Sequence, residues 1–333
     1  MASILVTGGA GYVGSVCCRR LLEQGHKVVV IDDLSSGRAA AVPGGASLYI
    51  LDYGDRAGVS RLLGHARIDA VFHFAAKALI PESVSNPGVF FDVNVSSAIA
   101  FLEVLRRFGV KRFVFSSSAA VYGSPQSDFI DEDDPKDPVN SYGESKLMLE
   151  RVLRWYAAAY GWTVAAFRYF NASGATREAG EDHQPETHII PLLLDVAAGD
   201  RPVFEMYGDD YDTPDGTCVR DYVHVSDIAG AHLLALNIPQ RAGMRIYNIG
   251  CGKGYSVREV VAAVQQVTGR KIPVRISARR PGDPPALCAS PARIERELRW
   301  KPLCSDLQNI IRTAWEWKIN SRRQRAVYER KMA

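Results

Sequence analysis

The fold is decided by the stretch SILVTGGAGYVG at residues 3–14, in which a short apolar run leads directly into a series of glycines. Residues 3–7 predict a buried strand, and the pattern from Val13 to Glu23 predicts an amphipathic helix. Between them three glycines are spaced GxxGxxG, namely Gly8, Gly11 and Gly14. A strand, a glycine loop of this spacing and a helix together predict an α/β fold that binds a dinucleotide.

Each glycine has a physical role in such a loop. Gly8 permits a tight turn, Gly11 lets the backbone approach a pyrophosphate, and Gly14 lets helix and strand pack closely. The N–H groups at the start of the helix then face the phosphates. A second apolar strand at 27–31 ends in Asp32, whose carboxylate can bind the adenosine ribose hydroxyls and repels a 2′-phosphate. The cofactor predicted by this end of the chain is therefore NAD rather than NADP.

The alternation of strand and helix continues to about residue 175. Further buried strands are predicted at 47–51, 69–76, 112–118 and 163–170. The helices between them include two long ones, at 87–107 and 141–159. Elements alternating at these lengths predict a Rossmann-type, doubly wound parallel sheet with its ligands at the carboxyl ends of the strands.

Beyond residue 175 the regular alternation stops. Residues 176–187 are polar and are interpreted as a boundary loop. Shorter elements are predicted at 189–198, 226–237, 256–268 and about 306–325. We therefore expect an NAD-binding Rossmann domain over residues 1–175 and a smaller, mixed α/β substrate-binding domain over residues 176–333.

Length and composition limit the classes of protein to which the chain can belong. The chain has 333 residues, of which 47% are hydrophobic and 23% charged, as in globular proteins with more than one small core. A net charge of +3 gives no reason to expect nucleic acid as a partner. The six cysteines lack CxxC spacing and the seven histidines lack HExxH, so we expect reduced thiols and no metal. We see no apolar run of membrane-spanning length and no signal peptide, which predicts a cytoplasmic protein without a membrane partner.

Three polar residues of the first domain form a candidate catalytic group. The strand at 112–118 ends in three serines, the last of which is Ser118. In the next helix Tyr142 and Lys146 are four residues apart, so they lie on one face a turn apart. Ser, Tyr and Lys together can remove a proton from a sugar or alcohol hydroxyl. An isolated YxxxK is typical of any exposed helix, and the glycine loop in the same domain favours the functional interpretation. His73, inside an apolar strand, is expected to be a core histidine.

Two further motifs complete a recognisable set. They are Tyr169-Phe170-Asn171 and the stretch DGTCVRDYVHV at 215–225, which contains Arg220. With the glycine loop, the serine strand and YxxxK in one chain and in this order, the sequence resembles the extended short-chain dehydrogenase/reductases of nucleotide sugars, most closely the UDP-glucose 4-epimerases. The resemblance covers nearly the whole chain, and the stretch around Arg220 is far more specific than the glycine loop.

The resemblance implies reversible, NAD-dependent 4-epimerisation of a UDP-hexose through a 4-keto intermediate, in a homodimer formed by the two long helices. In this family the residue matching Tyr142 is the base for the 4-hydroxyl proton. The residue matching Lys146 binds the nicotinamide ribose and lowers the pKa of the tyrosine, and Ser118 matches a residue that bonds the same hydroxyl. Lowering the pKa of a tyrosine to neutrality takes on the order of 4 kcal/mol. A cation at ~4 Å can supply that energy at an effective dielectric near 20.

The resemblance also implies the remaining contacts. Cofactor contacts fall on Gly8, Gly11, Tyr12, Val13, Gly14, Asp32, Asp33, Ser35, Ser36, Asp52, Tyr53, Phe74, Ala75, Ala76, Asn94 and Phe170, together with Tyr142 and Lys146. Substrate contacts fall on Asn171, His188, Tyr207, Arg220, Arg280, Asp283 and Leu287, together with Ser118 and Tyr142. Two arginines, a carboxylate and an aromatic face are chemically suited to uridine and a diphosphate.

Three positions depart from the family pattern or allow two interpretations. Lys77 comes one place before the position of a lysine that some epimerases place near the nicotinamide ribose, and Ala78 occupies that position. His188 stands where some members have an asparagine that contacts the diphosphate, and could donate a hydrogen bond there. Leu287 either lines the hexose pocket or is a core leucine under the substrate loop.

Other functions remain as alternatives. Nucleotide-sugar dehydratases carry an Asp-Glu pair directly after the residue matching Ser118, and decarboxylases usually keep the Glu. This chain has Ala119-Ala120 there, so it lacks those carboxylates. A UDP-pentose 4-epimerase or a UDP-glucuronate-modifying enzyme stays possible on sequence alone. A non-catalytic NAD(H)-sensing scaffold is disfavoured because Ser118, Tyr142 and Lys146 are all present.

Overall fold

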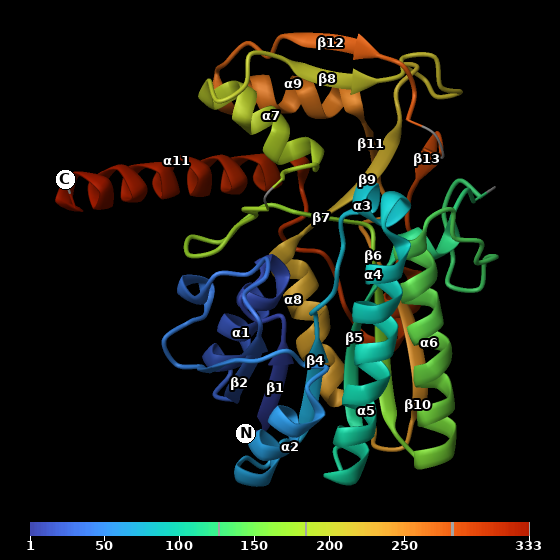
Figure 1. Ribbon diagram of the computed structural model, residues 1–333. Coiled ribbons are helices and arrows are strands. Elements are labelled where there is room, and N and C mark those ends of the chain that lie inside the picture. Colours follow the sequence, from blue (N-terminus) through green and yellow to red (C-terminus); the bar gives the residue numbers. More distant parts are fainter. Residues whose placement is uncertain (126, 184, 281–282, 333) are drawn as a thin grey trace.

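A seven-stranded parallel sheet forms the larger layer of the molecule (Figure 1). The structure is a computed structural model that describes residues 1–125, 127–183, 185–280 and 283–332, with the helical backbone alone for 323–332. The strands are β1 (Ser3–Thr7), β2 (Lys27–Asp32), β3 (Ser47–Ile50), β4 (Ala70–His73), β5 (Arg112–Ser118), β6 (Thr163–Tyr169) and β10 (Gly243–Ile249). Their order is β10-β6-β5-β4-β1-β2-β3, which confirms the predicted doubly wound Rossmann-type sheet.

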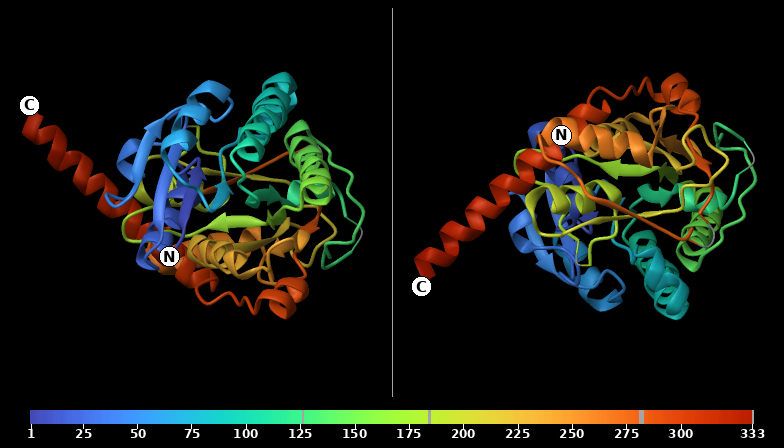
Figure 2. Two further views of the ribbon diagram at one scale, coloured as in Figure 1. Left: turned by 90° about the horizontal axis from the view of Figure 1, so that it is seen from below. Right: turned by 90° about the horizontal axis from the view of Figure 1, so that it is seen from above.

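Apolar side chains on both faces of this sheet explain why its strands read as continuous apolar runs. On one face Ile4 and Val6 are fully buried beneath α1 (Tyr12–Glu23) and α8 (Val225–Leu234). On the other face Leu5 and Phe113 lie in a second core with residues of α2 (Arg56–His65), α5 (Ala98–Arg107) and α6 (Ser141–Tyr160). The end-on views show these helices on opposite sides of the sheet (Figure 2).

The predicted helix at 87–107 is divided into three parts. An α-helical turn, α4 (Pro87–Phe91), continues into a π-helical segment, η2 (Asp92–Ser97), and then into α5; α3 (Ile80–Ser85) precedes them. By length and composition Pro87–Arg107 is apolar enough to span a membrane, so the expectation that no run reaches that length was wrong. Phe90 and Leu102 of this stretch are nevertheless fully buried inside the protein.

Local capping explains the start and end of α6. The side chain of Asn140 accepts a hydrogen bond from the N–H of Gly143, and Gly161 ends the helix in the left-handed conformation with φ of 64°. In a sequence, an Asn before an apolar-periodic stretch indicates the start of a helix, and a Gly after it indicates the end. The helix therefore holds Tyr142 in its first turn, beside the carboxyl end of β5.

Shorter elements form the region above the sheet in Figure 1. Strand β9 (Val219–His224) pairs with β7 (Asn171–Ser173), β11 (Gly254–Ser256) and β13 (Ala286–Leu287), and β8 (Phe204–Tyr207) pairs with β12 (Val274–Ser277). A third core lies among the helices α7 (Ile189–Ala198), α9 (Val257–Thr268) and α11 (Leu307–Met332). The C-terminal part of α11 extends away from the body (Figures 1 and 2).

Chain order and layers do not coincide. Helix α8 and strand β10 follow the expected domain boundary at residue 175, yet α8 packs against α1 and β10 pairs with β6 in the large sheet. The chain thus leaves the Rossmann layer after β6, returns to it with residues 225–249, and leaves it again. The final helix also continues to Met332, beyond its predicted end near 325.

Candidate active site

Strand β5 and helix α6 bring Ser118, Tyr142 and Lys146 together. Lys146 is only 3% exposed, and its Nζ donates a hydrogen bond to the carbonyl of Ser116 at 2.8 Å. The same Nζ lies 5.8 Å from the centre of the Tyr142 ring, and the Ser118 hydroxyl lies close enough to Tyr142 to lower its pKa. Three residue types that can act on a hydroxyl group therefore converge at the carboxyl end of the sheet, where the fold places ligands.

Burial shifts both ionisable groups of this trio toward their neutral forms. Burial raises the pKa of Tyr142, and the Ser118 hydroxyl offsets this only in part. Burial lowers the pKa of Lys146 to about 7, against the opposing effect of the Glu150 carboxylate. The expected lowering of the tyrosine pKa is thus not produced by the side chains alone. A further positive charge beside Tyr142 would lower it, and the oxidised nicotinamide ring of NAD carries such a charge.

A buried ion pair, which the sequence interpretation missed, fixes α6 to the sheet behind these residues. Glu150 and Arg168 are 3% and 1% exposed, and they form a bidentate pair with distances of 3.0 and 2.7 Å. The hydroxyl of Ser117 donates to the same carboxylate at 2.6 Å. One signal could have revealed the pair: Glu150 follows Lys146 by one helical turn, and Arg168 interrupts an apolar strand.

The glycine loop between β1 and α1 fits a dinucleotide. Gly8 has φ of +74°, and a Cβ there would lie 2.5 Å from the backbone nitrogen of Ala75. A Cβ on Gly14 would lie 2.1 Å from the carbonyl oxygen of Gly8, so helix and strand touch as predicted. A Cβ on Gly11 would meet only the Gly8 carbonyl, at 3.4 Å, which leaves space beside it among the described residues. Gly11 is also the N-cap of α1 and offers no side-chain acceptor. The N–H groups in the first turn of α1 are therefore suited to bind a phosphate.

Asp32 organises the loops around this site. Its two carboxylate oxygens accept hydrogen bonds from the N–H groups of Ala10 and Leu34, both at 2.9 Å. Burial raises the pKa of Asp32, and these two bonds offset the shift only in part. In the following turn Asp33 accepts a bond from the N–H of Ser35, with Ser36 next to it. Asp32 is thus at the end of β2, where an adenosine ribose would be bound in this fold.

The other predicted cofactor residues differ in what their side chains do. Asn94, in η2, is buried and binds both backbone groups of Lys77 and the hydroxyl of Ser145, so it joins the loop after β4 to α6. The Tyr53 ring lies in the core, 5.0 Å from the His73 ring, and its hydroxyl donates to the carbonyl of Val93. The remaining positions are Tyr12 and Val13 in the first turn of α1, Asp52 after β3, Phe74, Ala75 and Ala76 after β4, and Phe170 after β6.

His73 is a core residue, as expected. Its Nδ1 lies 2.7 Å from the hydroxyl of Thr7, and it is 2% exposed. Burial lowers the pKa of His73 to about 3, so the ring is neutral.

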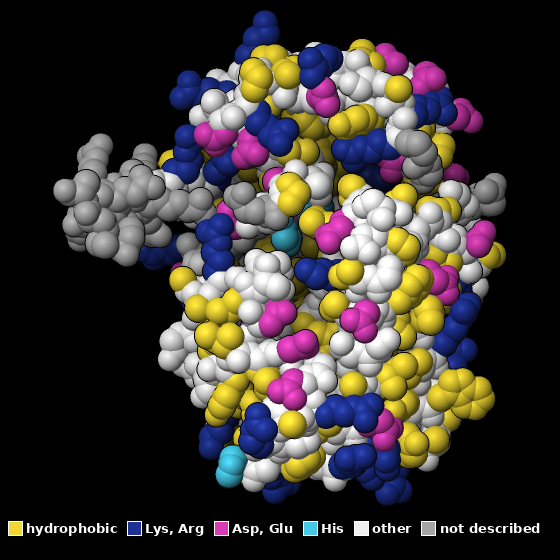
Figure 3. All heavy atoms as spheres, in the orientation of Figure 1, with side chains coloured by type: hydrophobic (Ala, Val, Ile, Leu, Met, Phe, Trp, Pro, Cys, Tyr) yellow, Lys and Arg dark blue, Asp and Glu magenta, His cyan; other side chains and the backbone are white. Residues whose placement is uncertain are grey.

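Predicted substrate residues meet in pairs near β9. The guanidinium of Arg280 lies 4.0 Å from the centre of the Tyr207 ring, and Arg220 pairs with Asp283 at 3.3 Å. Leu287, in β13, is the register partner of Arg220. Pro281 and Gly282 of the predicted motif lie outside the described residues. Figure 3 shows the surface hollowed between this region and the Rossmann layer, with basic and hydrophobic side chains around the hollow.

Two other predicted substrate residues have local partners. The side chain of Asn171 donates to the carbonyl of Asp221 at 2.8 Å, which holds the start of β7 against β9. His188 is the N-cap residue of α7 and contacts the carboxylates of Glu181 and Glu186. Burial lowers the pKa of His188, but the two carboxylates outweigh this and raise it to about 10.

Comparisons with known proteins agree with this fold. Residues 4–250 match the NAD dependent epimerase/dehydratase family, and the chain belongs to that family. It is 46% identical over 321 residues to the UDP-glucose 4-epimerase of Lacticaseibacillus casei, covering 96% of this chain and 97% of the relative.

Solved structures show the same likeness. The UDP-glucose 4-epimerase from Brucella ovis in complex with NAD superposes with a TM-score of 0.91 at 45% identity, covering 95% of this chain and 98% of that one. The UDP-glucose 4-epimerase from Bifidobacterium longum in complex with NAD+ and UDP also gives a TM-score of 0.91, at 36% identity, over 96% of this chain and 99% of that one.

Proposed function

We propose that this protein catalyses the reversible, NAD-dependent 4-epimerisation of a UDP-hexose, interconverting UDP-glucose and UDP-galactose. The observation that carries the proposal is the grouping of Ser118, Tyr142 and the buried Lys146 at the same sheet edge as the glycine loop. Relatives of the same length that are named UDP-glucose 4-epimerases support it.

Each residue of the trio has a defined task in this reaction. Tyr142 takes the proton of the sugar 4-hydroxyl, while Ser118 hydrogen-bonds the same oxygen and orients it. Bound NAD supplies the acceptor for the hydride from C4. The 4-keto sugar then turns in the site, its opposite face would take back the same hydride at C4, and Tyr142 returns the proton. Lys146 is held by the carbonyl of Ser116, and it orients the nicotinamide ribose and favours the phenolate of Tyr142.

The nucleotide side of the substrate is assigned to the residues around β9. Arg220 and Arg280 offer planar guanidinium groups for the diphosphate, and Tyr207 offers an aromatic face for the uracil. Asp283, which pairs with Arg220 at 3.3 Å, holds that arginine in place. Asn171 and the Nε2 of His188, whose Nδ1 contacts Glu181 and Glu186, are donors for the same diphosphate, and Leu287 lines the hexose. The nucleotide is thus held by charge while a leucine leaves the sugar pocket permissive.

We further propose a cytoplasmic homodimer. On α6 Trp155 is 75% exposed, and at the end of α5 Phe108 is 43% exposed, so aromatic surface is available on the two helices expected to form the contact. The six cysteines, all within the described residues, are free, as is usual in a reducing compartment. Light scattering at micromolar concentration should give twice the chain mass, and a monomer would exclude a stable dimer.

The proposed activity is tested directly with the purified protein. UDP-glucose, UDP-galactose, their N-acetylated forms and UDP-xylose are incubated separately, and the products are resolved by anion-exchange chromatography. Formation of the 4-epimer from either UDP-hexose supports the proposal. Conversion of UDP-xylose alone would indicate a pentose epimerase, loss of water would indicate a dehydratase, and NAD binding without turnover would indicate a sensor.

A further inference from the structure

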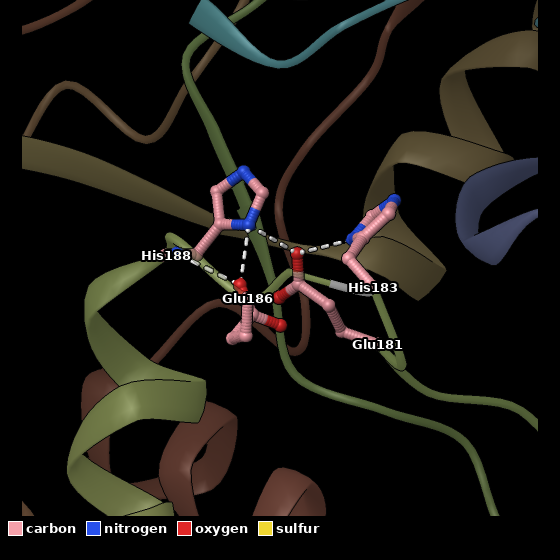
Figure 4. Close-up of side chains that lie close together, drawn as sticks. All are labelled: Glu181, His183, Glu186 and His188. Atoms are coloured by element: carbon pink, nitrogen blue, oxygen red, sulfur yellow. Dashed lines mark hydrogen bonds and ion pairs between the residues drawn. The ribbon is translucent and has the colours of Figure 1, made fainter. Parts of the chain in front are cut away.

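The segment between β7 and α7 carries two Glu-x-His pairs that meet in space. Glu181 and His183 form the first pair, and Glu186 and His188 the second. The Nδ1 of His188 lies 2.7 Å from Oε1 of Glu181 and 2.9 Å from Oε1 of Glu186, and the Nδ1 of His183 lies 3.2 Å from that same Glu181 oxygen (Figure 4). The four donor atoms all lie within 4.8 Å of one another.

The two carboxylates of this cluster have only histidines as ion-pair partners among the described residues. The side chains of Glu181 and Glu186 are only 8% and 13% exposed, and among the described residues their ion-pair partners are the two histidines. Neighbouring cations are engaged elsewhere, since Lys318 pairs with Asp195 and Asp200. Within the part of the chain that the structure describes, these two nearly buried carboxylates share only histidines as counter-charges, and a divalent cation would neutralise both of them.

The cluster is both held in place and reachable. Glu181, His183 and Glu186 line a cavity of about 440 Å³ that is bounded on another side by α11. The loop packs against the ring of Trp317 in α11 so closely that a Cβ on Gly180 would lie 2.5 Å from it. On the other side of the loop, Glu186 accepts hydrogen bonds from the N–H groups of Thr187 and His188 at 2.7 Å. An ion could therefore enter from the cavity and find its ligands already converging.

We propose that Glu181, His183, Glu186 and His188 bind a divalent transition-metal ion, with Zn²⁺ as the best match. Two imidazole nitrogens and two carboxylate oxygens suit zinc, which takes four such ligands at about 2.0–2.2 Å. In a tetrahedron of that size the ligand atoms are roughly 3.4 Å apart. The three shortest His–Glu separations, 2.7–3.2 Å, are slightly below this value and all four atoms lie within 4.8 Å of one another, so small side-chain rotations would complete the site. Bound there, the ion would hold the two Glu-x-His pairs together before the start of α7.

The expectation of no metal rested on the absence of HExxH and of compact ligand spacing. Here the spacing is ExHxxExH in a non-helical loop, with a bend at Pro185 between the two pairs. A search for helical ligand pairs does not find this pattern. The competing explanation is a hydrogen-bonded cluster alone, in which a protonated His188 is shared by two carboxylates.

Metal binding distinguishes these two explanations. Untagged protein is treated with a chelator, dialysed against Zn²⁺ at micromolar concentration, and its metal content is measured by mass spectrometry. We expect one Zn²⁺ per chain, and Co²⁺ in its place should give the intense visible absorption of tetrahedral cobalt. His183→Ala and the nearly isosteric Glu181→Gln each remove a ligand. Their affinity should fall by more than the roughly 10- to 100-fold that loss of an outer-shell partner costs.

A matched control and a second readout keep the outcome clear. His65→Ala removes an exposed histidine at the end of α2 and should bind Zn²⁺ like the unmodified protein. Zn²⁺ should raise the Tm of both, but not the Tm of His183→Ala, because a ligand stabilises only a protein that binds it. Circular dichroism verifies that each variant is folded. If the unmodified protein takes up no Zn²⁺, or if the ligand variants bind it equally well, the site is a hydrogen-bonded cluster and the proposal is wrong.

Discussion

The proposed catalytic trio and the proposed nucleotide-binding residues are built in different ways. Lys146 is 3% exposed and lies on a twenty-residue helix that the Glu150–Arg168 pair joins to the sheet. Arg220 and Asp283 are 15% and 37% exposed in their side chains, and the strand β13 next to them has only two residues. The residues proposed for catalysis thus lie on long, buried elements, and those proposed for nucleotide recognition lie on short strands and loops. Substitutions should therefore affect rate and stability in the first region, and specificity in the second.

The largest effect is expected from Tyr142→Phe. The ring and its packing remain, but the group that takes the proton is lost, so turnover should fall by roughly 10²- to 10⁴-fold. Binding of UDP, measured by calorimetry, should change little because Tyr142 acts on the sugar. Near-normal turnover in this variant would refute the assignment of Tyr142 as the base.

Breaking the buried Glu150–Arg168 pair should have an effect nearly as large, and this effect should be on the stability of the fold. Glu150→Gln leaves the Arg168 guanidinium buried without its counter-charge, which is expected to cost about 3–5 kcal/mol in the free energy of unfolding. Urea denaturation measures this value. The control is Glu144→Gln on the same helix, whose partner Arg151 is exposed and 3.8 Å away, and where less than about 1 kcal/mol should be lost. Equal losses in the two variants would contradict the role of the pair.

An effect of intermediate size is expected on the retention of NAD(H) when the Asp32 carboxylate is removed. The protein as purified should carry NAD(H) and be active without added cofactor, because the cofactor is regenerated in each cycle. Asp32→Ala removes a carboxylate whose hydrogen bonds are worth about 1.5–3 kcal/mol each, so it should retain NAD(H) roughly 10- to 150-fold less tightly. Asp69→Asn, beside β4 at the opposite end of the sheet, should retain it fully. A requirement for NADP would show that the interpretation of Asp32 is mistaken.

The smallest effect should be a change in sugar preference at Leu287. A difference in pocket size is worth only roughly 1–3 kcal/mol, so selectivity should be graded. We expect UDP-glucose and UDP-galactose to be the better pair, with measurable epimerisation of their N-acetylated forms. Leu287→Tyr should depress the N-acetylated reaction selectively, as measured by kcat/KM for the two pairs. Equal losses on both pairs would show that Leu287 supports the fold only, which its packing beside Phe170 and Leu147 also allows.

Local patterns explain what could be predicted from the sequence. The strands β1, β2 and β5 and the helix α6 followed from apolar runs, glycine spacing and caps, all of which are encoded within a few neighbouring residues. Tyr142 and Lys146 could be paired because helical geometry brings residues four apart onto one face. The convergence of Ser118 with them followed from the rule that parallel strands direct their ligands to one edge.

Contacts between distant segments could not be predicted in the same way. The pairing of β10 with β6, and of β8 with β12, depends on where the chain returns and not on the residues of either strand alone. The partnership of Glu150 with Arg168 needs the relative position of a helix and a strand. In η2 the π-helical turn places Asn94 against Ser145, although the apolar pattern of 87–107 is that of a regular helix.

The late position of β10 has a consequence for how the protein is made. This edge strand is synthesised about 80 residues after β6, the strand with which it pairs. At typical translation rates the nascent chain carries an unpaired β6 edge for on the order of 4–16 s. Helix α8, which covers α1, emerges from the ribosome in the same interval. For those seconds the chain presents a sheet edge and an uncovered apolar helix face, both of which invite aggregation, and it is then that chaperones would be most needed.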